Sequence, residues 1–239
     1  MAPLIKVEDL KQTVGKQIIL NSLSFQISSG ECLGLFGTRG VGKTTLLHIL
    51  AGVNRFKSGR VEILGYDIEK NGAYKKQMGL ITQKPSLFKD LQAYENLDFI
   101  AALKGADQHN IADLVQRFVL HDILREPVNK LDAGVYQRLS MACALLNEPQ
   151  ILIADDLIND IDPFSQSIIR RELNSFLISG GTCIWGFSRI EFCRCTSRVG
   201  WLEKGTLAFY TPQEAQAKWD RRWHHIAQQN EQQDGEDYA

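Results

Sequence analysis

The stretch G-T-R-G-V-G-K-T-T, residues 37–45, has residue types and spacing suited to holding phosphate groups. Its glycines allow the backbone to curl, so that successive N–H groups converge on phosphate oxygens. Lys43 would reach the β- and γ-phosphates, the Thr44 hydroxyl would ligate Mg²⁺, and Thr45 would donate to the α-phosphate. The pattern predicts a nucleoside triphosphate site made by Gly37, Thr38, Arg39, Gly40, Val41, Gly42, Lys43, Thr44 and Thr45. The alternative, a glycine-rich turn with an accidental lysine, does not account for this spacing.

Two adjacent carboxylates end the apolar run I-L-I-A-D-D at 151–156 and form a second group that can act on phosphates. Asp155 would hold Mg²⁺ through a water molecule, and Asp156 lies where a general base for an attacking water would stand. The alternative is that both acids only end a strand and cap the next helix. The phosphate loop favours the first interpretation, because a metal-bound triphosphate needs a carboxylate beside it.

Apolar segments flank these motifs in the order that a phosphate loop requires. The strand C-L-G-L-F ends just before Gly37, and T-T-L-L-H-I-L-A-G-V begins a helix that ends near Gly52. The partial positive charge of that helix N-terminus would add to the hold on phosphate. Strands with turns are expected within 4–36, 60–70, 78–83, 151–156 and 181–187, a hairpin at 199–210, and helices at 94–104, 109–120, 121–125, 135–147 and 163–178.

The composition is that of an ordinary globular protein. Among 239 residues, 44% are hydrophobic and 23% charged, and the net charge is −1. No basic excess favours binding to nucleic acid or to an anionic membrane surface. The apolar runs are far shorter than the roughly 20 residues of a membrane-spanning helix, and the first ten residues lack an apolar signal core. We therefore expect a soluble, unsecreted chain whose five cysteines are small buried hydrophobes.

These motifs make the sequence similar to the ATP-binding cassettes of ABC transporters, over about residues 4–215. Gln83, in I-T-Q-K-P-S-L-F, resembles the family's Q-loop glutamine, which senses Mg²⁺ and the γ-phosphate. The segment D-L-Q-A-Y-E-N-L-D-F-I-A-A-L-K-G resembles the start of the helical subdomain in cassettes that serve ABC-2-type exporters. Residues 131–156 align without a gap with the signature-to-Walker-B block, and 159–163 resemble the D-loop.

The resemblance implies a fold and a working assembly. The fold would be α/β, a RecA-like P-loop NTPase core with an antiparallel β lobe and an inserted α-helical subdomain. Two cassettes would dimerise, sandwiching each ATP between the P-loop of one and the signature motif of the other, and their closure would drive integral membrane subunits. The core would comprise 1–88 and 150–212, the helical subdomain 89–149, and a C-terminal helix with a disordered acidic tail 213–239.

The same resemblance implies a location and a metal site. The chain would lie peripherally on the cytoplasmic face of a membrane, with ATP and Mg²⁺ as cofactors. Thr44, Gln83 and Asp155 would hold the metal, and Asp156 and Gln83 would serve catalysis. The segment K-W-D-R-R-W-H-H at 218–225 would either pack Trp219 and Trp223 on one helix face or dock a partner.

The signature motif departs from the family's usual L-S-G-G-Q. It reads Leu131, Asp132, Ala133, Gly134 and Val135. In the family, the serine hydroxyl and the glycine N–H groups contact the partner's γ-phosphate, so the Asp132 carboxylate would bring like charges together. At about 4 Å and an effective dielectric constant of 20, these charges repel by roughly 4 kcal/mol. Because aspartate is also a strong N-cap, we expect Asp132 to keep the helix and to weaken the ATP sandwich.

Three further departures concern catalysis and adenine binding. Asp156 replaces the usual glutamate and is about 1.5 Å shorter, and a misplacement near 1 Å can cost on the order of 10²-fold in rate. I-W-G-F-S-R contains no histidine, so Phe187 or Ser188 takes the place of the family's switch histidine. Val14 falls near the position of the aromatic residue that stacks on adenine, and its loss is expected to reduce affinity.

Together these features predict an ABC-type ATPase that binds MgATP and has impaired hydrolysis. We expect an ATP-binding subunit of a transporter, an exporter by resemblance, paired with a different and more active cassette. Two alternatives stay open: a regulatory or structural module that uses ATP to hold a dimer together, and a soluble ABC protein of translation or DNA repair. The last usually has two cassettes or a long coiled-coil insertion, and neither pattern occurs in this sequence.

Overall fold

The computed structural model describes residues 3–222, and its largest element is a six-stranded sheet. The strand order is β10-β9-β3-β8-β7-β6, and every neighbouring pair is parallel except the β9–β10 hairpin. The strands are β3 (Cys32–Phe36), β6 (Met78–Ile81), β7 (Ile151–Asp155), β8 (Thr182–Phe187), β9 (Arg198–Glu203) and β10 (Thr206–Tyr210). Parallel strands place their carboxyl ends at one edge, so the loops after β3, β7 and β8 lie together there.

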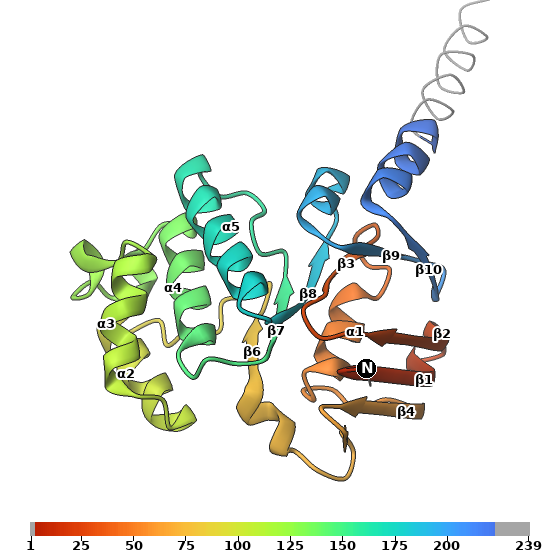
Figure 1. The fold of residues 1–239 in the computed structure, drawn as a ribbon, viewed down its shortest axis with the longest axis horizontal. Helices are drawn as coiled ribbons and strands as arrows, with labels where there is room; N and C mark the ends of the chain where they lie inside the picture. Colours follow the sequence, from red (N-terminus) through yellow and green to blue (C-terminus); the bar gives the residue numbers. More distant parts are fainter. Residues whose placement is uncertain (1–2, 223–239) are drawn as a thin grey trace, which may run out of the picture.

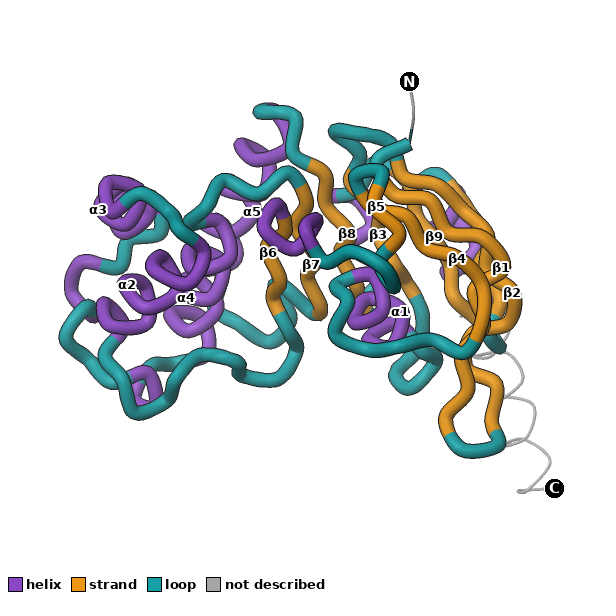
Figure 2. Tube along the Cα trace, turned by 90° about the horizontal axis from the view of Figure 1, so that it is seen from below, coloured by secondary structure: helices purple, strands orange, loops and turns teal. Residues whose placement is uncertain are grey.

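A second, four-stranded sheet is antiparallel throughout, with the order β2-β1-β4-β5. Its strands are β1 (Ile5–Val14), β2 (Gln17–Ile27), β4 (Ser58–Ile63) and β5 (Tyr66–Asp67). Figures 1 and 2 place this sheet at one end of the molecule and most of the helices at the other. This arrangement gives the β lobe that the resemblance implies.

The helices lie on both sides of the main sheet. They are α1 (Lys43–Leu50), α2 (Ala93–Lys104), α3 (Gln108–Arg117), α4 (Ala133–Leu145) and α5 (Pro163–Ile178), followed by a helical segment at 212–222. Short 3₁₀ turns occur at η1 (Ala73–Gln77), η2 (His121–Ile123), η3 (Val128–Lys130) and η4 (Ile190–Cys195). Figure 1 shows α2, α3 and α4 gathered beyond the β6 edge of the sheet.

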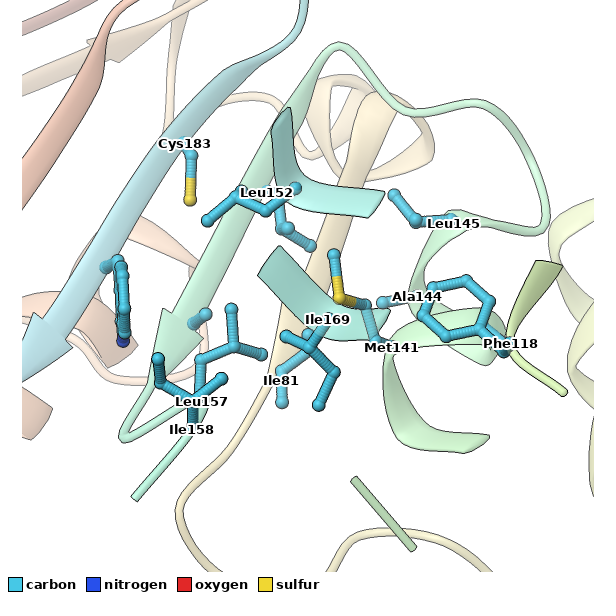
Figure 3. Close-up of a cluster of buried hydrophobic side chains, with 14 of the residues drawn as sticks. Ile81, Phe118, Met141, Ala144, Leu145, Leu152, Leu157, Ile158, Ile169 and Cys183 are labelled. Atoms are coloured by element: carbon cyan, nitrogen blue, oxygen red, sulfur yellow. The ribbon is translucent and has the colours of Figure 1, made fainter. Parts of the chain in front are cut away.

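The core has two layers because the central strands are buried on both faces. On β7, Ile151 and Ile153 pack toward α1 and the small sheet, whereas Leu152 and Ala154 pack toward α4 and α5. Figure 3 shows the second layer, with Leu152 beside Met141 of α4 and Ile169 of α5. Burial on both faces explains why these strands are continuous apolar runs rather than alternating ones.

Most predicted elements are confirmed, including the hairpin turn, where Lys204 and Gly205 both have positive φ. The helix predicted at 121–125 is wrong, since only the 3₁₀ turn η2 forms there. The carbonyls of Leu124 and Glu126 instead accept from the N–H groups of Tyr94 and Ala93, which would otherwise lack partners at the start of α2. This use of the carbonyls prevents the segment from continuing as a helix.

The cysteine prediction is confirmed for the four buried residues Cys32, Cys143, Cys183 and Cys193, while Cys195 is half-buried. Among residues 3–222, none of the helices has the length and apolarity that crossing a bilayer requires. Trp219, in the helical segment at 212–222, packs its ring against Phe36 and Trp201. Trp223 and the predicted acidic tail lie outside the described residues.

Candidate nucleotide-binding site

The phosphate loop lies between β3 and α1, as the sequence predicts. Gly42 precedes the helix with a φ of 113°, a conformation that disfavours any other residue. A Cβ atom added there would lie 2.7 Å from Cγ2 of Ile19 in β2, too close for a normal contact. Glycine at this position therefore lets the loop pass close under the small sheet and turn directly into α1.

The Lys43 side chain lies within the curl of this loop and is only 7% exposed. Its Nζ donates to the carbonyl oxygens of Gly37 (2.7 Å) and Thr38 (3.1 Å) and to Oγ of Ser188 (2.9 Å). Burial lowers the pKa of Lys43, and the carboxylates of Asp156 and Asp155 oppose that shift. A buried cation held by neutral acceptors gains free energy when an anion binds beside it, as a phosphate would.

Thr44 and Asp155 bring two oxygen donors together at the ends of α1 and β7. The Thr44 hydroxyl donates to Oδ2 of Asp155 at 2.6 Å, and Asp155 is only 3% exposed. Hydroxyl and carboxylate oxygens are the ligands that Mg²⁺ prefers. This pair fits the metal site that the sequence predicts, and the bound ion would supply positive charge to the phosphates.

Asp156 follows β7 in a turn with a φ of 54°, which aspartate tolerates better than most residues. Its Oδ2 accepts a hydrogen bond from Nε2 of Gln83 at 2.8 Å. Burial raises the pKa of Asp156, and the neighbouring Asp155 adds to the rise, whereas Lys43, Arg39 and Gln83 oppose it. The structure thus brings the predicted base and the predicted Q-loop glutamine into direct contact.

The signature segment begins α4, and Asp132 caps that helix. Oδ1 of Asp132 accepts from the backbone N–H of Val135 at 2.8 Å, so the predicted N-cap is confirmed. The helix starts at Ala133, two residues before the predicted start at 135, because its N-cap is Asp132. A Cβ atom on Gly134 would lie 2.0 Å from Oδ2 of Asp162, so glycine permits α4 to pack against the start of α5.

A cleft of about 610 Å³ is lined by residues from several of the predicted motifs. They include Arg39, Gln83 and Asp156, together with Leu131 and Ala133 of the signature segment. The remaining lining residues include Asn159, Asp160 and Ile161 of the predicted D-loop. Parts of these motifs therefore line one cavity, whereas Lys43, Thr44, Asp155 and Asp132 are not among its lining residues.

Two residues stood as alternatives for the place of the switch histidine, and they have different surroundings. Phe187 is fully buried and packs against Phe36 and Trp185. Ser188 accepts the hydrogen bond from Lys43, so it is the residue that faces the phosphate loop. Val14, at the end of β1, is 62% exposed and offers no aromatic ring for a nucleobase.

The structure also shows a link that the sequence did not indicate. The Tyr136 hydroxyl, one residue beyond the signature motif, accepts from the N–H groups of Ser86 (2.7 Å) and Leu87 (3.2 Å). Those residues follow Gln83, so the signature helix is tied to the Q-loop segment. A tyrosine in a helix carries no sequence signal for such a contact, because the N–H groups that donate to it depend on how two distant segments pack.

Comparison with known proteins assigns the chain to a family. The family model described as ABC transporter matches residues 20–159. The chain is 32% identical over 179 residues to the lantibiotic transport ATP-binding protein SrtF of Streptococcus pyogenes, covering 75% of this chain and 77% of that protein. The chain belongs to the ABC transporter family, as an ATP-binding cassette.

Further relatives agree with this assignment. The cassette is 31% identical over 227 residues to the bacitracin transport ATP-binding protein BcrA of Bacillus licheniformis, covering 93% of this chain and 74% of that protein. A solved ATP-binding subunit of an ABC transporter superposes with a TM-score of 0.81 at 23% identity, covering 91% of this chain and 93% of that one. A cassette solved as a dimer with ADP and Pi has a TM-score of 0.80 at 22% identity, covering 87% and 98%. The predicted fold class is confirmed.

Proposed function

We propose that this cassette is the MgATP-binding subunit of an exporter, with weak hydrolysis of its own. The observation that carries the proposal is the meeting of Lys43, Thr44 and Asp155 at one edge of the main sheet. Lys43 would bind the β- and γ-phosphates, and Thr44, Asp155 and Gln83 would hold the metal. The transport proteins among its relatives support export as the process that it serves.

Weak hydrolysis follows from the residues around the γ-phosphate position. Asp156 is shorter than the family's glutamate, and its carboxylate is engaged by Gln83. Ser188 has no ring nitrogen with which to stabilise charge on the phosphate, and its hydroxyl is engaged by Lys43. Because the proposed general base is shorter than glutamate and already hydrogen-bonded, and because the switch residue is altered, the cassette would activate water poorly. It would still bind ATP.

We further propose that the cassette works in an unequal pair. Asp132 would oppose the γ-phosphate bound to a partner, so this chain would contribute poorly to the partner's ATP site. A different, more active cassette would supply an intact signature for the ATP held by Lys43. Residues 89–149 would form the helical subdomain that presents the signature to that partner.

Exposed apolar side chains on α2 and the loop before it support attachment to membrane subunits. Of the twelve large hydrophobic residues exposed in the described chain, five lie between 88 and 103: Phe88, Leu91, Tyr94, Phe99 and Leu103. The rings of Phe88 and Phe99 contact each other at 5.0 Å between centroids. Gathered apolar exposure of this kind marks protein interfaces, and here it would place the cassette peripherally on the cytoplasmic face of a membrane.

Purification of the tagged cassette from its native membranes in detergent tests this proposal. We expect a polytopic membrane protein and a second cassette to co-purify with it, and Phe99→Asp to release the membrane protein. Ile178→Asp is the matched control, because Ile178 is 78% exposed at the far end of α5. If both the wild type and Phe99→Asp were recovered only as free homodimers, the proposed attachment to a transporter would be refuted.

A further inference from the structure

Arg39 is a cation of the phosphate loop whose side chain has no assigned role. It is exposed, and it forms no ion pair with any of residues 3–222. It follows Thr38, whose carbonyl oxygen accepts from Nζ of Lys43, so the Lys43 ammonium lies against the turn of the loop that carries Arg39. Arg39 therefore remains available to an anion that enters the cleft.

The neighbours of Arg39 indicate which part of a nucleotide it would meet. Arg39 lines the 610 Å³ cleft together with Gln83 and Asp156, the two residues that would surround the terminal phosphate. Its charge reaches that end of the site, since it opposes the rise in the pKa of Asp156 caused mainly by burial. It also adds to the burial-driven fall in the pKa of Lys43. The guanidinium thus lies on the γ-phosphate side of the loop.

The place of the switch histidine carries no cation. Ser188 occupies the place of the switch histidine, and its hydroxyl faces Lys43 at 2.9 Å rather than the cleft. The nearby side chains Asp155 and Asp156 are both acidic, which is unfavourable for a terminal phosphate. A guanidinium can offset this, because it presents parallel N–H donors that match two phosphate oxygens.

We propose that the Arg39 side chain binds the γ-phosphate of ATP held in its own cassette and thereby gives the site its preference for ATP over ADP. This inference rests on the proposed nucleotide binding and adds a γ-phosphate contact from the side chain, beyond the backbone contacts of the loop. This contact would stabilise bound ATP without activating an attacking water, which agrees with the proposed binding of ATP with weak hydrolysis.

Equilibrium binding of ATP, its β,γ-imido analogue and ADP, each with Mg²⁺, tests the proposal. The measurements use the full chain at concentrations where sedimentation shows a monomer, so that no partner contributes. We expect Arg39→Ala to weaken ATP and the analogue by about tenfold, the loss of one charge-assisted contact, and ADP by less than about threefold. Arg39→Lys should recover part of the ATP affinity, because it keeps the charge without the fork.

Arg55→Ala is the matched control, since Arg55 is another exposed arginine beyond the far end of α1. It should leave all three affinities unchanged. An unchanged ATP-to-ADP ratio in Arg39→Ala, whether both affinities fall equally or neither falls, would overturn the inference and leave the proposed nucleotide binding intact. A wild-type chain that binds none of the three ligands would overturn both.

Discussion

The two halves of the site differ in how closely they follow the family. On the phosphate-loop side, Lys43, Thr44 and Asp155 are the family's own residue types, and they contact one another or the loop. On the signature and switch side, we propose that Asp132 and Ser188 stand in place of the serine and the histidine, and their side-chain oxygens are engaged within the chain.

This difference separates two tasks that an ATPase usually combines. Holding a triphosphate requires the curled loop, the buried lysine and the metal ligands, and these residues are retained. Activating water and closing on a partner would require the groups that are substituted here, of which Asp156 lines the cleft whereas Asp132 and Ser188 bond within their own chain. We therefore expect changes on the first side to abolish binding and changes on the second to alter turnover or pairing.

The largest effect is expected from Lys43→Ala. Removing the buried cation should weaken ATP binding by at least about 100-fold, because its charge-assisted bonds to two phosphates are lost together. Calorimetric titration with MgATP measures this, with Lys57→Ala, an exposed lysine outside the site, as the control. Retained nucleotide affinity in Lys43→Ala would show that residues 37–45 are not the phosphate site.

Restoring the longer acid is expected to raise turnover. Asp156→Glu should increase the ATPase rate by on the order of tenfold, since the carboxylate reaches nearer to the attacking water. Asp122→Glu is the matched control, because Asp122 is an exposed aspartate in η2 and does not line the cleft. A rate in Asp156→Glu no higher than in Asp156→Ala would mean that acid length does not limit hydrolysis.

A smaller effect is expected at the signature helix. Asp132→Ser should strengthen ATP-dependent dimerisation several-fold, roughly five-fold or more, by removing like-charge repulsion while keeping an N-cap residue. Sedimentation velocity with and without MgATP measures the dimer, and Asp107→Ser is the control. Asp107 caps α3 through the N–H of His109, so it tests the cap alone. Equal dimerisation of Asp132→Ser and wild type would remove the role assigned to this carboxylate.

The smallest effect concerns the pH dependence of folding stability. Because burial raises the pKa of Asp156 in the folded chain, its ionisation disfavours the folded state. Stability should fall as pH rises from about 3.9, the usual pKa of an unfolded aspartate, through the raised folded pKa. Asp156→Asn does not titrate, so its free energy of unfolding should increase relative to wild type over that range. Denaturant titrations between pH 4 and 8 would contradict this if wild type gained stability instead.

The sequence was sufficient for the phosphate loop because its chemistry is local. Glycines, a lysine and a threonine at fixed spacing between a strand and a helix can form few other structures. The strand ends carrying Asp155 and Asp156 were likewise predictable, since a buried strand followed by carboxylates is a local pattern.

Other features depend on packing between distant segments and could not be read from the chain. Whether Phe187 or Ser188 faces the loop depends on the register of the strand, because a shift of one residue exchanges the side chains on its two faces. The contact between Gln83 and Asp156 joins loops 73 residues apart. Gly134 is glycine because α5 approaches it closely, which only the packed structure reveals.

The proposed separation of ATP binding from ATP hydrolysis is tested by measuring MgATP affinity and steady-state ATP hydrolysis in parallel on the purified wild-type chain. We expect saturable MgATP binding that depends on Lys43, together with a turnover close to the background measured for Asp156→Ala. A turnover like that of cassettes with an intact glutamate and histidine would contradict this separation.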